Sequence, residues 1–314
     1  LSSAASDVYK RQDMNKALII AAAAVPVYAV WDIYRFVFWR SRSRLSTLLL
    51  DKKGHAEDYY VRRDSAADRL REKMHVRYTI SSDRGETLQG FYYPAGKKPG
   101  KKLVFIVHGY HSEHAETAGM FYDLYHSRGF DIFTCDNTAS GESGGKLFGY
   151  NVFESADCLK WLNFLRSQFG EDIKVGLHGF SLGGATVLKM SDRCPDCVKF
   201  IVSDSGFIDA REILRSQLGP LYGLMAGLNR IVAGYDLAET DVRENIKNSP
   251  LPFLIVHGKD DKTVPFSMAP RIFELCPNDK DFLFTEGAKH IETMHIAPEA
   301  YARKLDRFIK EYLQ

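Results

Sequence analysis

The chain has 314 residues, of which 45% are hydrophobic and 26% are charged. This length and composition are sufficient to bury one large core, and α/β folds of this size often form a single domain. The formal net charge is only +2, which gives no indication of a nucleic-acid partner. We therefore expect a globular protein whose partners are not nucleic acids.

The N-terminal 13 residues are interpreted as a non-native extension. Residues 7–12 match the translation of a sequencing-library transposon end, and a methionine follows one residue later. We expect Met14 to be the natural start of the protein.

An apolar segment occupies much of residues 14–44. Residues 17–31 carry no charge, Asp32 and Arg35 interrupt the run, and further arginines follow an aromatic stretch. We favour a membrane anchor over residues 17–39, because the length suits a bilayer and aromatic and basic residues flank it. A cleaved signal peptide and a packed or interfacial helix are the alternatives. The basic residues after the segment predict a membrane-associated protein with its main domain on the cytoplasmic side, export being the alternative.

The chain then changes from polar sequence to alternating strands and helices. Residues 45–75 are rich in charge and are expected to form a linker or a helical lead-in. From residue 76 to residue 314, short apolar runs alternate with helical patterns, which predicts an α/β domain. We expect a doubly wound, mostly parallel sheet of about eight strands, at Val76–Ile80, Thr87–Tyr93, Leu103–Val107, Phe130–Cys135, Ile173–Leu177, Phe200–Ser203, Phe253–Val256 and Phe282–Phe284.

The strand Leu103–Val107 runs directly into the sequence His-Gly-Tyr-His at residues 108–111. In folds with a nucleophilic serine on a strand-to-helix turn, the loop after such a strand supplies one oxyanion amide, here the N–H of Tyr110. The three histidines at positions 108, 111 and 114 also suggest a metal site. No cysteine or carboxylate framework accompanies them, so we expect no metal.

A second motif follows the strand Ile173–Leu177. The sequence Gly-Phe-Ser-Leu-Gly at residues 179–183 fits the G-x-S-x-G nucleophile elbow, between a predicted strand and a predicted helix. Such a turn exposes the Ser181 oxygen, and the N–H of Leu182 becomes the second expected oxyanion donor. Taken alone the motif is weak, because a turn of this composition can simply join a strand to a helix.

The segment of about residues 207–249 is longer than a simple crossover needs, and we expect a helical cap insert there. Its apolar residues recur at helical spacing, which is typical of a packed helical pair. The functional hypothesis is a lid in which Leu221, Leu224 and Met225 contact substrate. The same insert carries Glu239, Asp241 and Glu244, which could hold a free amino terminus in a peptidase, although a solvated turn is favoured.

An acid and a base follow the serine in the order Ser…Asp…His. Asp261 lies on the loop after the strand Phe253–Val256 and is preferred over Asp260, because it fits the pattern H-G-x-x-D-x-x-V-P. His290 follows the last predicted strand on a glycine-containing loop, and it is preferred over His295, which lies deeper toward the terminal helix. We expect Asp261 to orient His290, and His290 to activate Ser181.

The five cysteines are odd in number and fall mostly in predicted strands or helices. Cys194 and Cys197 form a C-x-x-C pattern without a thioredoxin-like context. We expect a reduced structural pair rather than a redox centre.

Together these motifs resemble the α/β-hydrolase superfamily from about Val76 to the C-terminal residue, and most closely bacterial serine-aminopeptidase-like or acyl-esterase-like hydrolases with an N-terminal hydrophobic segment. There is one departure. Residues 137–140 read Asn-Thr-Ala-Ser, where relatives usually carry a D-x-R-G-x-G-x-S turn, so the arginine and one glycine are missing. This bears on the local loop geometry and not on the chemistry.

The resemblance implies a serine hydrolase that cleaves a carboxylic ester, or a related acyl bond, of a small-molecule substrate through an acyl-enzyme. It implies no metal or organic cofactor. An aminopeptidase, amidase or thioesterase using the same triad is the first alternative. A non-catalytic, membrane-tethered binding module is the second.

Overall fold

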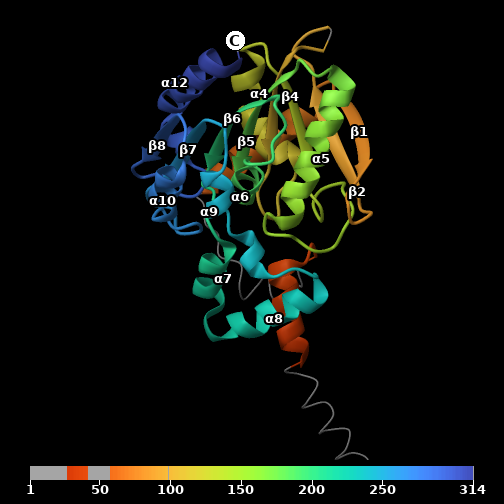
Figure 1. Ribbon diagram of the computed structural model, residues 1–314, viewed down its shortest axis with the longest axis vertical. Coiled ribbons are helices and arrows are strands. Elements are labelled where there is room, and N and C mark those ends of the chain that lie inside the picture. Colours follow the sequence, from red (N-terminus) through yellow and green to blue (C-terminus); the bar gives the residue numbers. More distant parts are fainter. Residues whose placement is uncertain (1–26, 42–56, 98, 314) are drawn as a thin grey trace, which may run out of the picture. The chain divides into compact units, whose positions relative to one another are not determined.

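The computed structural model describes residues 27–41, 57–97 and 99–313 (Figure 1). The chain divides into two compact units, residues 1–51 and 52–314. In the first unit, residues 27–38 form a helix in which the rings of Trp31, Tyr34 and Phe38 stack in sequence. Within the described ranges, no helix has the length and apolar character needed to cross a membrane. Residues 1–26, which include Met14 and the first ten residues of the predicted anchor, lie outside the described residues.

The second unit is built on one eight-stranded sheet with the order β1-β2-β4-β3-β5-β6-β7-β8. β2 is antiparallel to both of its neighbours, and the strands from β4 to β8 are parallel. The prediction of a mostly parallel sheet of about eight strands is confirmed. The strands are β1 (Val76–Ser81), β2 (Thr87–Tyr93), β3 (Lys102–Val107), β4 (Asp131–Asp136), β5 (Lys174–Phe180), β6 (Val198–Asp204), β7 (Phe253–Gly258) and β8 (Lys280–Thr285).

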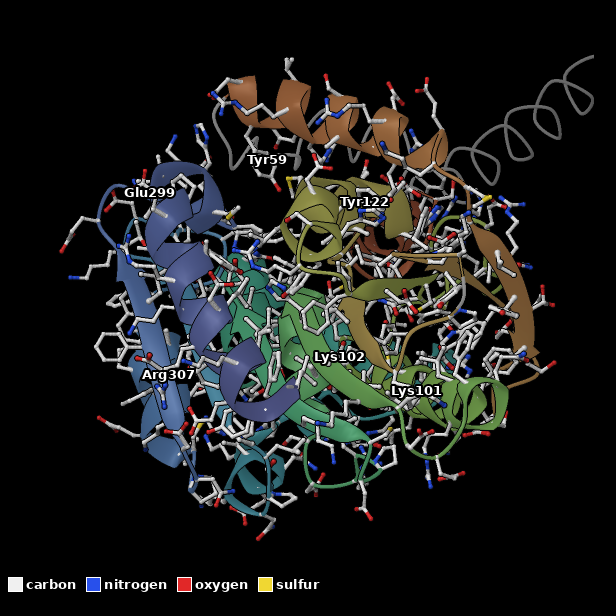
Figure 2. All side chains as sticks on the ribbon, turned by 90° about the horizontal axis from the view of Figure 1, so that it is seen from above. Tyr59, Lys101, Lys102, Tyr122, Glu299 and Arg307 are labelled. Atoms are coloured by element: carbon white, nitrogen blue, oxygen red, sulfur yellow. The ribbon has the colours of Figure 1, made fainter. Side chains whose placement is uncertain are left out.

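Helices cover both faces of this sheet. Apolar residues of α5, α6, α9 and α10 pack on one face, and those of α3, α4 and α12 pack on the other; Figure 2 shows Tyr59, Tyr122 and Glu299 on the helices of the second layer. The helices are α3 (Glu57–Arg71), α4 (His114–His126), α5 (Val152–Phe169), α6 (Leu182–Lys189), α7 (Ala210–Leu218), α8 (Tyr222–Val232), α9 (Arg243–Lys247), α10 (Met268–Leu275), α11 (Thr293–Ile296) and α12 (Pro298–Phe308), with short turns η1 (Gly219–Leu221), η2 (Leu237–Thr240) and η3 (Ile309–Leu313).

The sequence of β3 explains why helices are needed on both faces. Leu103, Phe105 and Val107 point into the core beneath α5 and α6, whereas Val104 and Ile106 point into the core beneath α4 and α12. Successive side chains of a strand alternate between faces, so an unbroken apolar run requires two apolar layers.

The helix α3 comes from the charged segment ahead of the first strand and contributes to the core. Its Ala67 and Leu70 are buried in the same cluster as residues of α4. The two helices approach closely at Gly119, where an added Cβ would lie 2.5 Å from the Ala66 carbonyl oxygen. Part of the segment expected to be a linker or lead-in therefore packs within the larger unit.

The predicted insert leaves the sheet after β6 and returns before β7. It contains α7, η1, α8, η2 and α9. In Figure 1, α7 and α8 lie beyond the carboxyl ends of the parallel strands. This is the edge at which β5 turns into α6, so the insert and the serine turn belong to the same end of the sheet.

Candidate active site

Ser181 is the single residue between the end of β5 and the start of α6. Its φ is +53°, in the left-handed region that costs energy for a residue with a Cβ. The turn is possible because glycines flank it: a Cβ on Gly179 would lie 2.1 Å from the Gly183 carbonyl oxygen, and one on Gly183 would lie 2.1 Å from that of Val107. The G-x-S-x-G spacing thus reflects close backbone contacts on both sides of the serine.

The structure brings together Ser181, His290 and Asp261, which are far apart in the sequence. His290 Nε2 lies 2.8 Å from Ser181 Oγ, and His290 Nδ1 lies 2.7 Å from Asp261 Oδ2. The serine hydroxyl can donate to Nε2 while Nδ1–H donates to the carboxylate. The alternative acid and the alternative base have other surroundings. Asp260 is exposed, and the His295 ring lies 2.8 Å from Arg62 Nη1.

The surroundings of Asp261 favour its ionised form. Oδ1 accepts hydrogen bonds from the backbone N–H groups of Thr263 and Val264, both at 2.9 Å. Burial alone would raise the pKa of this carboxyl, but the charges and hydrogen bonds of His290 and His257 outweigh burial and hold it well below its usual range. The carboxylate is thus anionic where it meets the imidazole.

His257 is a contact of Asp261 that was not predicted as a site residue. Its Nε2 lies 3.1 Å from Asp261 Oδ2 and 3.0 Å from the Val264 carbonyl oxygen. Both are acceptors, so Nε2 carries the proton, and the fully buried Nδ1 has no hydrogen-bond partner among the described residues. The signal in the sequence was the motif H-G-x-x-D, in which the histidine precedes the acid by four residues.

The loops that carry the acid and the base are joined through their backbones. The N–H of Asp260 donates to the Ala288 carbonyl at 3.0 Å, and the N–H of Lys259 donates to that of Thr285 at 2.9 Å. A Cβ on Gly258 would lie 2.2 Å from the Ala288 oxygen. A residue with a Cβ at position 258 would clash with the loop that carries His290. Gly258 is therefore required for this loop to pack against the loop that carries Asp261.

The two predicted oxyanion donors lie on segments that flank the serine. Leu182 is the first residue of α6, so its N–H has no acceptor within the helix. On the other side, a Cβ added to Gly109 would lie 3.4 Å from Ser181 Cβ, and Tyr110 follows that glycine. His108 fixes this loop, with Nδ1 lying 2.8 Å from the Gly109 oxygen and Nε2 accepting from the Asn137 N–H at 3.0 Å.

The turn that departs from the usual motif keeps a glycine-like backbone. Ala139 has φ +66°, so an alanine adopts the left-handed conformation in a turn where relatives carry an additional glycine. Asp136, just before the turn, accepts from the N–H of Glu142 at 2.7 Å and from that of His114 at 2.8 Å. The altered sequence thus still closes into a hydrogen-bonded turn.

The three histidines considered as metal ligands do not share a donor set. His108 binds backbone groups as above, whereas His114 Nδ1 lies 2.9 Å from Glu113 Oε2 and 3.1 Å from Asp136 Oδ1. Burial lowers the pKa of His114, but these two hydrogen-bonded carboxylates raise it to about 9. The group Glu113, His114 and Asp136 has a spacing that a metal ion could use, with ligand atoms within 4.8 Å of one another. An imidazolium between two carboxylates accounts for the same spacing.

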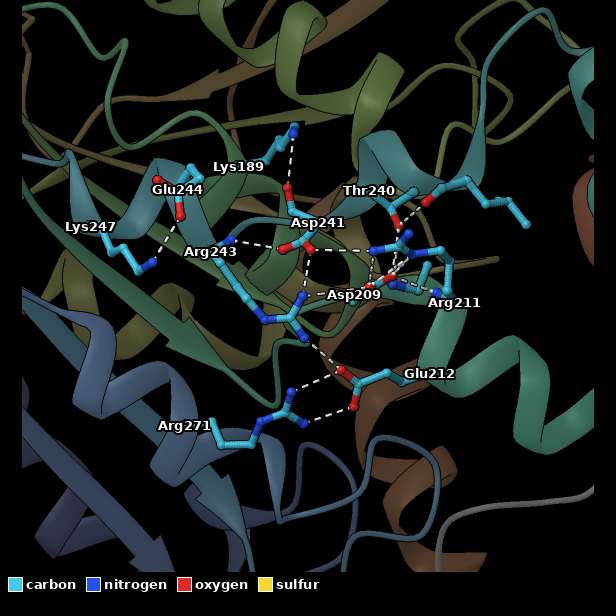
Figure 3. Close-up of polar contacts among 12 residues, drawn as sticks. Lys189, Asp209, Arg211, Glu212, Thr240, Asp241, Arg243, Glu244, Lys247 and Arg271 are labelled. Atoms are coloured by element: carbon cyan, nitrogen blue, oxygen red, sulfur yellow. Dashed lines mark hydrogen bonds and ion pairs between the residues drawn. The ribbon is translucent and has the colours of Figure 1, made fainter.

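Each carboxylate considered for a peptidase site has a polar partner, and Figure 3 shows the partners of Asp241 and Glu244. Asp241 pairs with Arg243 and with Arg211, the latter at 3.3 Å. Glu244 pairs with Lys247 at 2.8 Å, and Glu239 accepts the N–H of Asp236 at 2.9 Å. These acids are neutralised or used in capping, and they do not form a shared carboxylate cluster.

The three residues expected to contact substrate differ in exposure. Leu221 and Leu224 are 38% and 48% exposed, whereas Met225 is fully buried. Leu221 ends η1, and the other two lie in the first turn of α8.

Cys194 and Cys197 are both unpaired thiols in the structure. Burial raises the pKa of Cys197 to about 11, and it raises that of Cys194 further. Redox chemistry requires a thiolate, so this environment disfavours it.

Comparison with known proteins agrees with this fold. The family described as "alpha/beta hydrolase fold" matches residues 102–228. The uncharacterized protein YqkD of Bacillus subtilis is 24% identical over 241 residues, covering 74% of this chain and 78% of its own. The esterase Pf2001 of Pyrococcus furiosus superposes with a TM-score of 0.63 at 20% identity, covering 78% of this chain and 96% of its own. Acetyl xylan esterase 1 from Thermoanaerobacterium superposes with a TM-score of 0.57 at 18% identity, covering 83% and 96%. The order of the strands and these matches agree, and the chain has the α/β-hydrolase fold.

Proposed function

We propose that this protein is a serine hydrolase that cleaves a carboxylic ester through an acyl-enzyme. The observation that supports the proposal most directly is the hydrogen-bonded series from Ser181 through His290 to Asp261. A hydroxyl, an imidazole and a buried carboxylate in this order can activate the hydroxyl as a nucleophile.

In the acylation step, Ser181 Oγ attacks the carbonyl carbon of the ester, and His290 Nε2 takes the hydroxyl proton. The Asp261 carboxylate holds Nδ1–H and stabilises the imidazolium that forms. The backbone N–H groups of Tyr110 and Leu182 donate to the developing oxyanion, each contributing about 3 kcal/mol of transition-state stabilisation. The intermediate collapses when His290 protonates the alkoxide leaving group, and the acyl group stays on the serine.

Deacylation repeats the sequence with water as the nucleophile. His290 Nε2 removes a proton from the water as it attacks the acyl carbonyl, and it then returns a proton to Ser181 Oγ. The products are a carboxylic acid and an alcohol. Every proton transfer in this scheme uses a group on the chain.

An ester is favoured over a peptide because of the insert. The acids that could hold a free amino terminus are paired with arginines, a lysine or a backbone N–H. The exposed side chains of Leu221 and Leu224 offer an apolar surface that suits an acyl chain. Two solved structures with this fold are named as esterases, which agrees with the same choice.

The test is turnover of a short p-nitrophenyl ester by the purified protein. Ser181→Ala should remove hydrolysis, because no nucleophile remains, while the melting temperature stays near that of the unmodified protein. Ser191→Ala is the matched control, since it deletes a serine hydroxyl outside the proposed triad, one that donates to the Leu188 and Asn245 carbonyl oxygens. Unchanged turnover in Ser181→Ala would overturn the proposal.

A further inference from the structure

Two adjacent residues at the end of β6 contact both the nucleophile turn and the base loop. The Asp204 carbonyl accepts the N–H of Ser181 at 2.8 Å, and Ser205 Oγ accepts the N–H of Ile291 at 3.1 Å. Ile291 directly follows His290. Asp204 and Ser205 are both fully buried.

Three of the residues in these two hydrogen bonds, Ser181, Ser205 and Ile291, have unfavourable backbone conformations. Ser181, Ser205 and Ile291 have φ values of +53°, +54° and +58°. A β-branched residue such as isoleucine is a rare occupant of this region, so surrounding contacts must hold it there. The hydrogen bond from the Ile291 N–H to Ser205 Oγ is one such contact.

The Ser205 hydroxyl is itself oriented by a buried carboxylate. It donates to Asp204 Oδ1 at 2.9 Å, so its lone pairs face the Ile291 N–H. The other oxygen, Asp204 Oδ2, accepts from the Tyr301 hydroxyl at 2.8 Å. Burial raises the pKa of Asp204 to about 6, against the lowering effect of these two hydroxyls.

The series of hydrogen bonds continues from Tyr301 to two further buried side chains. Because the Tyr301 hydroxyl donates to Asp204, its oxygen can accept from His178 Nε2–H, which lies 2.8 Å away. His178 Nδ1 is then the acceptor for the Tyr125 hydroxyl, also at 2.8 Å. Burial lowers the pKa of His178, which agrees with the neutral ring that this pattern requires. Every donor in the series of hydrogen bonds from Tyr125 to Ile291 therefore has an acceptor.

We propose that Ser205 is a positioning residue, whose hydroxyl is oriented by Asp204 and holds the Ile291 amide so that the His290 imidazole stays in line with Ser181. The inference rests on the proposed function, because it assigns His290 a role as the base. Ser205 is not expected to touch substrate. Its contribution is to the geometry of proton transfer, where small displacements are costly.

The experiment compares Ser205→Ala and Ser205→Gly with the unmodified protein and with Ser191→Ala. Both Ser205 variants lose the hydroxyl, but glycine adopts φ +54° without strain whereas alanine adopts it at an energetic cost, so the glycine variant should melt higher. For a short p-nitrophenyl ester we expect kcat to fall about tenfold to a hundredfold in both, with KM changed little. Ser191→Ala should keep its kcat.

A purely structural role would give a different pattern. If kcat followed the melting temperature across the three variants, or if Ser205→Ala kept kcat within twofold, the proposal would be wrong. Should both Ser205 variants fail to fold, Tyr301→Phe removes a donor to Asp204 without touching Ser181 or His290. It should also lower kcat while leaving KM unchanged, and an unchanged kcat in that variant would overturn the inference.

A separate readout distinguishes this inference from the proposed function. Hydrogen exchange of the Ile291 amide should be faster in Ser205→Ala than in the unmodified protein, whichever reaction the site performs. If the unmodified protein hydrolyses no ester, the proposed function fails, and the exchange rate alone then decides whether Ser205 holds the base loop. An Ile291 amide that exchanges at the same rate in both proteins would contradict the positioning role.

Discussion

At the scale of single residues, the proposed chemistry depends on an ionised Asp261 in a buried site. Burial opposes the charge, and hydrogen bonds from two backbone amides and two histidines compensate for it. The same bonds fix the carboxylate against His290 Nδ1, which selects the tautomer that leaves Nε2 free to accept the serine proton. Charge and orientation are therefore supplied by the same contacts.

Replacing Asp261 by asparagine should keep the shape and remove the charge. The amide can present its N–H₂ group to His290, which favours the wrong tautomer, so we expect kcat to fall by about 10⁴ with a smaller change in KM. Steady-state kinetics on a p-nitrophenyl ester would measure this. Asp260→Asn is the matched control, and equal losses in the two variants would contradict the choice of Asp261 as the acid.

The lowered pKa of Asp261 also predicts how stability depends on pH. An aspartate whose folded pKa is depressed stabilises the fold above its unfolded pKa, about 3.9, and this contribution is lost as pH falls through the folded value. The free energy of unfolding should therefore decline below about pH 4. Urea titrations at several acidic pH values should show a shallower decline for Asp261→Asn, and identical slopes would argue against a stabilised carboxylate.

At the scale of elements, the insert is fixed at its base by ion pairs (Figure 3). Glu212 of α7 is held by Arg271 of α10 at 2.8 and 2.9 Å and by Arg243 of α9 at 2.8 Å. By contrast, Asn229 and Arg230 of α8 bond to Tyr235 and Asp236, which belong to the insert itself. This anchoring suits a cap whose base is attached to the core and whose far helix is free to contact substrate.

The lid hypothesis makes opposite predictions for two neighbouring residues of α8. Leu224 is 48% exposed and Met225 is buried. Leu224→Ala should alter the preference for acyl-chain length, by about fourfold in kcat/KM for each methylene no longer covered, with little loss of stability. Met225→Ala should instead lower the free energy of unfolding by about 2–5 kcal/mol.

A series of p-nitrophenyl esters from acetate to octanoate, together with thermal melts, would measure both effects. If Leu224→Ala melted several degrees lower and kept its chain-length profile, α8 would be a packing element. The assignment of Leu221 and Leu224 to the substrate site would then be wrong.

At the scale of the whole molecule, the fold was largely predictable because its signals are local. The run Leu103–Val107 is apolar at every position, which is typical of a strand buried on both faces, and similar runs marked the other strands. The turn at Ser181 was predictable for the same reason, since strand, glycines and helix lie within one short segment. The strand β2 was predicted with its observed bounds, whereas other strand ends were missed by one to three residues, as at β5, where polar His178 and Gly179 obscured the last positions.

The supporting contacts of the site could not be predicted in this way. Tyr301 reaches Asp204 across 97 residues and His178 across 123. One sequence does not reveal which distant polar residues meet in a core, because a buried tyrosine or histidine has the same local pattern whatever its partner. His257 was closer to being predicted, since it lies four residues from Asp261 in a motif already identified.

The central claim is that Ser181 is a nucleophile activated by His290, and labelling with a fluorophosphonate tests it most directly. The reagent forms a covalent bond with an activated serine, and peptide mass spectrometry identifies the modified residue. We predict one adduct, at Ser181, in the unmodified protein and in Asp260→Asn, a much slower reaction in His290→Ala, and none in Ser181→Ala. An unmodified protein that stays unlabelled, or an adduct on any other residue, would contradict the account.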